Sequence, residues 1–138
     1  PAVERREAGF AAALPPHATL ERLACDETGH AGVVAAIAIR LAAATRPDAV
    51  VGANDQIGIA ALAAAHKLGL AVPGALRVTG FNGFAFRNYA QPLLTTVLSP
   101  AYALGERVAA LVLNRLDGQP FPRQPVVLDI ALEAGDSS

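Results

Sequence analysis

The segment PDAVVGANDQIGIAAL, residues 47–62, decides the fold of this chain. Its first part, AVVGA, is a continuous apolar run of strand length, which is typical of a parallel strand covered on both faces. Asn54 and Asp55 follow, and either side chain can accept hydrogen bonds from the free N–H groups of a helix start. A helix is predicted over residues 56–68, and Gly69 then suits a left-handed cap. The segment therefore predicts a buried strand, a polar turn and a helix.

The same order of strand, polar turn and helix occurs on both sides of this segment. A strand is predicted over residues 20–25, and Thr28 then caps a helix over residues 29–45. Another strand is predicted over residues 76–81 and is followed by Asn82. This alternation favours an α/β domain with a mostly parallel sheet.

The outer parts of the chain follow other patterns. The predicted elements are a first helix that ends before Pro15, an irregular segment at residues 84–92, a strand over 94–99, an amphipathic helix over 102–116 and a final strand over 126–132. Residues 135–138 are expected to fray.

Composition limits the classes of function. The 138 residues are 53% hydrophobic and 17% charged, which favours one domain with a packed interior. The formal net charge is −1, so the basic face of an autonomous nucleic-acid-binding module is missing. A single cysteine, Cys25, permits no internal disulfide and favours a cytoplasmic protein. The chain has neither a signal-peptide pattern nor an apolar run of the roughly 20 residues that a membrane helix needs.

The residues that carry chemistry in enzymes do not form a recognisable set. The glycine patterns of dinucleotide sites and phosphate-binding loops do not occur. His17, His30 and His66 lie on different predicted elements, so we expect neither a metal site nor a cofactor. Cys25 is interpreted as a small core residue, and no nucleophile–base pair is present. A small α/β enzyme is therefore the weakest of the functional alternatives.

Polar residues follow three of the predicted strands. In an α/β sheet, ligands collect outside the carboxyl ends of the strands, where Glu27, Asn54 and Asn82 are expected. Side chains that both donate and accept hydrogen bonds suit a hydroxyl-rich small molecule. The alternative is that these residues only cap helices and turns.

Five motifs in register carry a family resemblance. They are RREAGF at residues 5–10, the segment 47–62, LGLAVP at 68–73, VTGFN at 78–82 and PLLTTV at 92–97. Together they resemble the effector-binding domain of LacI/GalR-type transcription repressors, from about residue 3 to residue 132. The resemblance implies the fold of type I periplasmic sugar-binding proteins, in which two doubly wound α/β lobes close on a small effector.

The resemblance also implies a division of the chain. Residues 1–93 would form part of the C-terminal lobe, residues 94–125 the inter-lobe hinge and crossover, and residues 126–138 a final strand and tail. The DNA-binding headpiece and most of the N-terminal lobe are expected outside this chain. The strand that precedes the first helix is expected there too, which would leave a slot in the sheet empty or filled by another chain.

Site residues carry over from the resemblance one by one. Arg6 is expected to reach into the cleft, where a guanidinium can grip two oxygens at once. Asn54 would contact effector hydroxyls while Asp55 caps the helix, and Ser99 is a further effector-binding candidate. Glu27 stands near the place where relatives carry a stacking aromatic, which is a departure from the family pattern.

The sharpest departure is Asn82, where relatives carry an aspartate that accepts hydrogen bonds from sugar hydroxyls. A neutral amide beside Arg6 would tolerate an anionic ligand, which a carboxylate would repel. The hypothesis is a sugar acid, such as a gluconate-like effector, ahead of a neutral sugar. The segment GFNGF at residues 80–84 also resembles the branch that includes gluconate-operon repressors.

Three aromatic residues, Phe84, Phe86 and Tyr89, lie in the irregular segment. Relatives use this neighbourhood for dimer contacts, and the alternative is that the rings fold back onto their own core. The resemblance thus implies a homodimer that senses a sugar or sugar acid and acts on operator DNA through its headpiece, without catalysis or membrane contact. The main alternative is a periplasmic sugar-binding protein of a transporter.

Overall fold

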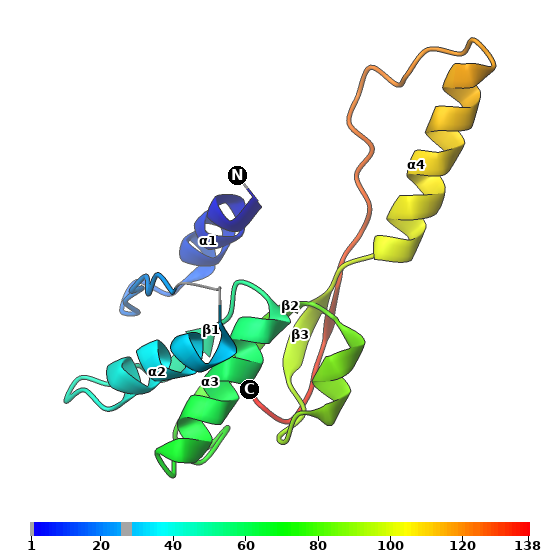
Figure 1. The fold of residues 1–138 in the computed structure, drawn as a ribbon. Coiled ribbons are helices and arrows are strands. Elements are labelled where there is room, and N and C mark those ends of the chain that lie inside the picture. Colours follow the sequence, from blue (N-terminus) through cyan, green and yellow to red (C-terminus); the bar gives the residue numbers. More distant parts are fainter. Residues whose placement is uncertain (1, 26–28) are drawn as a thin grey trace.

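The computed structural model describes residues 2–25 and 29–138 (Figure 1). In chain order the elements are α1 (Ala2–Ala13), α2 (His30–Leu41), β1 (Ala49–Val51), α3 (Asp55–Lys67), β2 (Arg77–Asn82), the 3₁₀ helix η1 (Ala85–Tyr89), β3 (Thr95–Leu98), α4 (Ala101–Leu116) and β4 (Ala131–Glu133). The predicted α/β class is confirmed.

The described strands form one sheet in the order β1-β2-β3-β4. β1 and β2 pair in parallel, as do β2 and β3, whereas β4 pairs antiparallel to β3. The three parallel strands therefore end at one edge of the sheet, which is where ligands collect in such folds.

The core lies between this sheet and the helices α2 and α3, which pack against each other (Figure 1). Leu76, Val78 and Leu94 are fully buried beneath α3. Small residues on α3, among them Ala61, Ala64 and Ala65, are buried as well and allow the close approach of helix and sheet. The alanines of α3 are therefore covered, whereas α1 has no buried residue.

Local signals predict the end of α3 better than the end of α2. Gly69, two residues after the end of α3, has the predicted left-handed φ of +66°. α2 ends at Leu41, four residues before the predicted end, and its N-cap is Gly29. The predicted cap, Thr28, lies outside the described residues.

The predicted strand over residues 20–25 is wrong: these residues have no strand structure. Among the described residues β1 pairs with β2 alone, and a cavity of about 690 Å³ lies between its other edge and the segment 18–25. A strand needs a hydrogen-bonded neighbour, which this segment lacks. It is held by side chains instead, since Arg40 donates two hydrogen bonds to Glu21 (2.7 and 2.6 Å) and thereby lowers the pKa of that carboxyl.

The expected fraying of residues 135–138 is also wrong. Ser137 is fully buried, its hydroxyl donates to the carbonyl of Val78 (2.6 Å) and accepts from the N–H of Thr95 (2.9 Å). Its backbone carbonyl accepts a further bond from the N–H of Val78 (2.7 Å). The N–H of Gly135 donates to the Thr95 hydroxyl (2.9 Å). Residues 135–138 are therefore hydrogen-bonded to β2 and to the first residue of β3.

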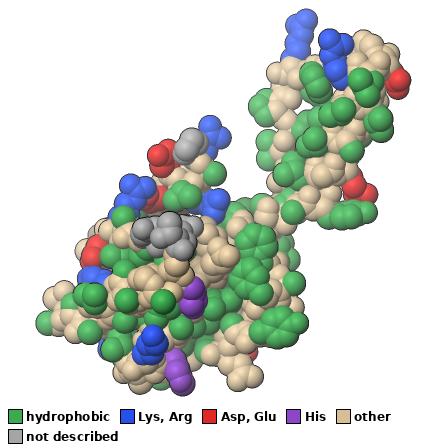
Figure 2. Space-filling view, viewed as in Figure 1, with side chains coloured by type: hydrophobic (Ala, Val, Ile, Leu, Met, Phe, Trp, Pro, Cys, Tyr) green, Lys and Arg blue, Asp and Glu red, His purple; other side chains and the backbone are tan. Residues whose placement is uncertain are grey.

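α4 and the chain that returns from it form an arm that extends away from the sheet (Figure 1). No residue of α4 is buried. Apolar side chains cover the arm (Figure 2), including Leu104, Val108, Val112, Phe121 and Ile130. The final strand is shorter than predicted, because only residues 131–133 reach a partner, β3.

The helix η1 is the one regular element within the predicted irregular segment. Arg87, which is 4% exposed, fastens it: its guanidinium donates to the carbonyl of Leu94 and pairs with Glu133 on β4. Within the described part of the chain, no helix is long and apolar enough to cross a membrane.

Candidate functional site

The structure brings three predicted site residues to the carboxyl edge of the parallel strands. Asn54 lies three residues after β1, Asn82 is the last residue of β2, and Ser99 follows β3 directly. The N–H of Ser99 donates to the carbonyl of Asn82 (3.1 Å), which fixes the ends of β2 and β3 side by side.

Asn54, and not Asp55 as expected from the sequence, caps α3. The Oδ1 of Asn54 accepts a hydrogen bond from the N–H of Ile57 (2.9 Å), so Asn54 caps α3. Asp55 does not cap: its carboxylate is fully buried and accepts from the N–H of Phe84 (2.7 Å) and the hydroxyl of Thr96. The cap leaves the amide nitrogen of Asn54 as the group with which it can face a ligand.

Asn82 has a strained backbone. Its φ is +108°, a value that residues with a side chain rarely adopt and that asparagine tolerates better than most. Gly83 continues the turn with a φ of +73°, and an added Cβ there would lie 2.3 Å from the Leu98 side chain. The chain therefore turns sharply at the point where β2 presents Asn82, and such strain is common at ligand sites.

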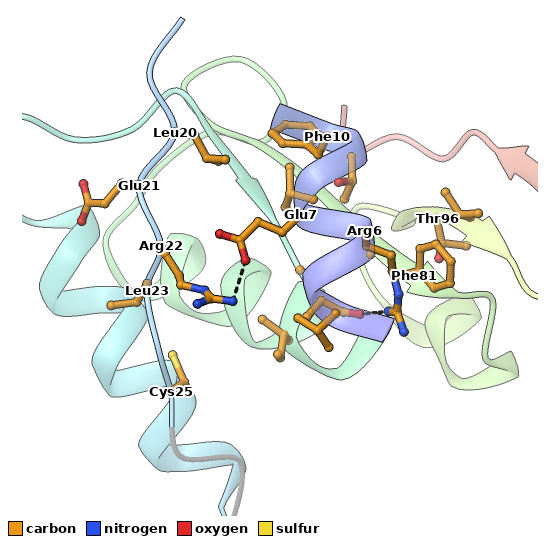
Figure 3. Close-up of a pocket in the computed structure, with 18 of the residues that line it drawn as sticks. Arg6, Glu7, Phe10, Leu20, Glu21, Arg22, Leu23, Cys25, Phe81 and Thr96 are labelled. Carbon is orange, nitrogen blue, oxygen red and sulfur yellow. Dashed lines mark hydrogen bonds and ion pairs between the residues drawn. The ribbon is translucent and has the colours of Figure 1, made fainter. Parts of the chain in front are cut away.

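Arg6 is fixed at the same edge by two contacts (Figure 3). Its Nη1 donates to the carbonyl of Ala53 (2.5 Å), one residue before Asn54. Its Cζ lies 4.1 Å from the ring centroid of Phe81, one residue before Asn82. The half-buried guanidinium thus joins α1 to the ends of β1 and β2.

A cavity of about 680 Å³ lies beside Arg6, between α1, the segment 20–25 and one face of the sheet (Figure 3). Its lining is mainly apolar and includes Phe10, Leu20, Leu23 and Phe81. Arg6 is the member of the predicted effector set that lines it in the described part of the chain. This apolar wall does not match a hydroxyl-rich ligand, which the polar strand edge suits better.

The remaining predicted residues divide into two groups. Glu27 lies outside the described residues. Phe84, Phe86 and Tyr89 are 45%, 37% and 89% exposed, so Tyr89 is largely open to solvent while the two phenylalanine rings are partly covered. The rings of Phe84 and Phe86 stack with centroids 5.3 Å apart, and we call these three residues the aromatic patch. In the described residues, no three His, Cys, Asp or Glu side chains gather where they could hold a metal ion.

Comparison with known proteins shows the family. All 138 residues match the model of a periplasmic binding protein-like domain. The lactose operon repressor of Rhizobium radiobacter is 32% identical over 97 residues, which are 70% of this chain and 82% of that protein. The chain belongs to the periplasmic binding protein-like family and, within it, to the LacI-type effector-binding domains.

Solved structures agree with this assignment. The transcription regulator GntR from Chromobacterium violaceum matches with a TM-score of 0.86 and 32% identity, over 99% of this chain and 52% of that one. A sugar-binding LacI-family regulator from Escherichia coli, complexed with phosphate, matches with a TM-score of 0.81 and 28% identity, over 98% of this chain and 49% of that one. The family resemblance and fold predicted from the sequence are thus confirmed, and the chain spans about half the length of these structures.

Proposed function

We propose that this chain is the ligand-sensing part of a transcription regulator and that it binds a small sugar or sugar acid at the carboxyl edge of its sheet. The observation that carries the proposal is the meeting of Arg6, Asn54, Asn82 and Ser99 at this edge, with Asn82 in a strained backbone conformation. A similar Escherichia coli regulator is described as sugar-binding, which supports the ligand class.

The chemistry of the edge favours an anionic effector. Asn82 is neutral, and the guanidinium of Arg6 lies over the ring of the preceding residue, Phe81. A carboxylate ligand would gain a charge-assisted hydrogen bond from Arg6 and would meet no repulsion from Asn82. We therefore place an aldonate such as gluconate ahead of the corresponding neutral sugar.

A thermal-shift comparison of gluconate with glucose on the full-length regulator tests this preference. A ligand at about a hundred times its dissociation constant stabilises the folded state by about 2.7 kcal/mol, which is a readable shift. We expect gluconate to raise the melting temperature and glucose to leave it nearly unchanged. A shift with glucose alone would contradict the anionic effector, and a shift with neither would contradict the site.

Arg6→Ala and Arg5→Ala form the matched pair for the same assay. Arg5 is exposed, whereas Arg6 makes the two contacts at the strand edge. The loss of a charged hydrogen bond should weaken gluconate binding by about tenfold to a hundredfold for Arg6→Ala. Equal affinities for the two variants would remove Arg6 from the site.

We further propose that the aromatic patch is part of a homodimer contact. Stacked, exposed aromatic rings are enriched in protein interfaces, and Tyr89 is the most exposed member. Tyr89→Asp should weaken the dimer at least about tenfold in sedimentation equilibrium. Ile39→Asp is the control, since Ile39 is 77% exposed on α2, outside the aromatic patch and the arm. If both variants stay as dimeric as the wild type, the dimer uses another surface.

In this proposal the apolar arm crosses to the second lobe, with residues of about 94–125 serving as hinge and crossover. Closure of the lobes on the effector would change the affinity of a headpiece outside this chain for operator DNA, inside the cytoplasm. The alternative, a periplasmic sugar-binding protein, has the same lobe. A full-length gene that encodes a signal peptide in place of a helix-turn-helix would decide for the alternative.

A further inference from the structure

Asp55 is a buried carboxylate that the effector site itself does not use. It is the first residue of α3 and is 0% exposed. Among the described residues it takes part in no ion pair; its charge is compensated by hydrogen bonds and by the N-terminus of α3. Burial of a charge is costly unless hydrogen bonds satisfy it, so the position calls for an explanation.

The two oxygens of Asp55 join two different parts of the lobe. Oδ2 accepts from the N–H of Phe84, in the turn after β2, and Oδ1 accepts from the hydroxyl of Thr96, which is fully buried in β3. Gly80 provides the space for this carboxylate, because a Cβ there would lie 2.4 Å from Oδ1. The start of α3, the turn after β2 and the strand β3 are therefore held together through one side chain.

Residues adjacent to these three segments belong to the two proposed surfaces, the effector edge and the aromatic patch. On one side, Asn54 precedes Asp55, and Asn82 lies two residues before Phe84; both belong to the proposed effector edge. On the other side, Phe84 stacks on Phe86 in the aromatic patch. The hydrogen bond from Phe84 to Asp55 lies between the effector edge and the patch.

We propose that Asp55 is a positioning residue that fixes the turn of residues 82–84 against α3, and so makes effector affinity depend on the placement of the aromatic patch. The inference rests on the proposed effector site and extends it to a residue that does not touch the ligand. Asp55 acts through the amide of Phe84, and Thr96 orients its carboxylate.

Amide hydrogen exchange of this chain tests the positioning role without any ligand. Asp55→Ala should make the Phe84 N–H exchange at least about tenfold faster than in the wild type, relative to amides of the core strands. Asp55→Asn keeps one acceptor oxygen for Phe84 and can donate to Thr96, so it should retain most of the protection. Leu41→Ala, a core change on α2 that lies away from the site, is the control for general loss of stability.

Binding of gluconate and glucose to the full-length regulator tests the effect of Asp55 on effector affinity. For whichever of the two binds the wild type, Asp55→Ala should raise the dissociation constant at least about tenfold, with Asp55→Asn restoring most of the affinity. Leu41→Ala should lower the melting temperature without this loss of affinity. An equal loss of affinity in Leu41→Ala, or unchanged Phe84 exchange in Asp55→Ala, would overturn the positioning role.

Two other results of these experiments also bear on the proposal. If the wild type binds neither sugar, the proposed effector site fails, while the exchange of Phe84 still decides whether Asp55 holds the turn. If Asp55→Ala does not fold, Thr96→Val and Thr96→Ser replace it. The valine removes the donor to Oδ1 and should speed Phe84 exchange, whereas the serine keeps the hydroxyl and should not; equal exchange in both would refute the proposal.

Discussion

Leu94→Ala is expected to lower the free energy of unfolding by about 2–5 kcal/mol, as large-to-small changes in a packed core do. Leu94 is fully buried, and both of its methyl carbons lie close to Gly58 on α3, at 2.9 and 3.1 Å from where a Cβ would stand. The cavity would open between α3 and the sheet. Urea unfolding followed by circular dichroism would measure the loss.

Leu116→Ala is the matched control, because it removes the same atoms from a side chain that is 77% exposed at the end of α4. Its unfolding free energy in this chain should stay within about 0.5 kcal/mol of the wild type, as surface changes usually do. Similar losses in the two variants would mean that the core does not lie between α3 and the sheet.

Gly80→Ala should also destabilise the fold, with a cost of about 1–3 kcal/mol or more. The added methyl would stand 2.4 Å from the Asp55 carboxylate and 2.9 Å from Leu94, both of which are fully buried. The neighbours cannot yield without breaking the hydrogen bonds of Asp55. Thermal unfolding would report the loss.

Gly105→Ala should have the opposite sign in the same assay. Gly105 lies inside α4 with nothing within 4 Å of its added Cβ, and alanine is the better helix former there by about 0.5–1 kcal/mol. Opposite effects of the two substitutions would separate the steric clash at Gly80 from the gain in helix propensity at Gly105. Stabilisation by both substitutions would show that the space beside Gly80 is open.

Elements with complete local signals could be predicted from the sequence. The segment 47–62 has an apolar run, a capping residue and an apolar helix face, and it forms β1 and α3 as expected. The ends of the parallel strands then place Asn54, Asn82 and Ser99 together, because parallel topology alone dictates that edge. The family resemblance implies the same positions for these residues.

Features that depend on a distant partner could not be predicted. The segment 20–25 has strand composition, but a strand exists only beside another strand, and its composition does not reveal whether one is there. Asn54 and Asp55 are equally good capping residues by type, so only the positions of Phe84 and Thr96 show which of them turns inward. A polar pair at a helix start, followed by a glycine-bearing strand, is the signal that could have suggested a buried carboxylate.

The contacts of residues 135–138 impose an order on the assembly of the sheet during protein synthesis. Ser137 bonds to Val78, 59 residues earlier in the chain, and to Thr95, 42 residues earlier. Ribosomes synthesise the chain from its N-terminus, so β2 and β3 emerge long before the residues that satisfy Val78 and Thr95. A nascent chain stalled before residue 137 would hold these polar groups unpaired inside the sheet. The hydrogen bonds of Val78 and Thr95 to Ser137 can therefore form only after residue 137 has been synthesised, when β2 and β3 have long been complete.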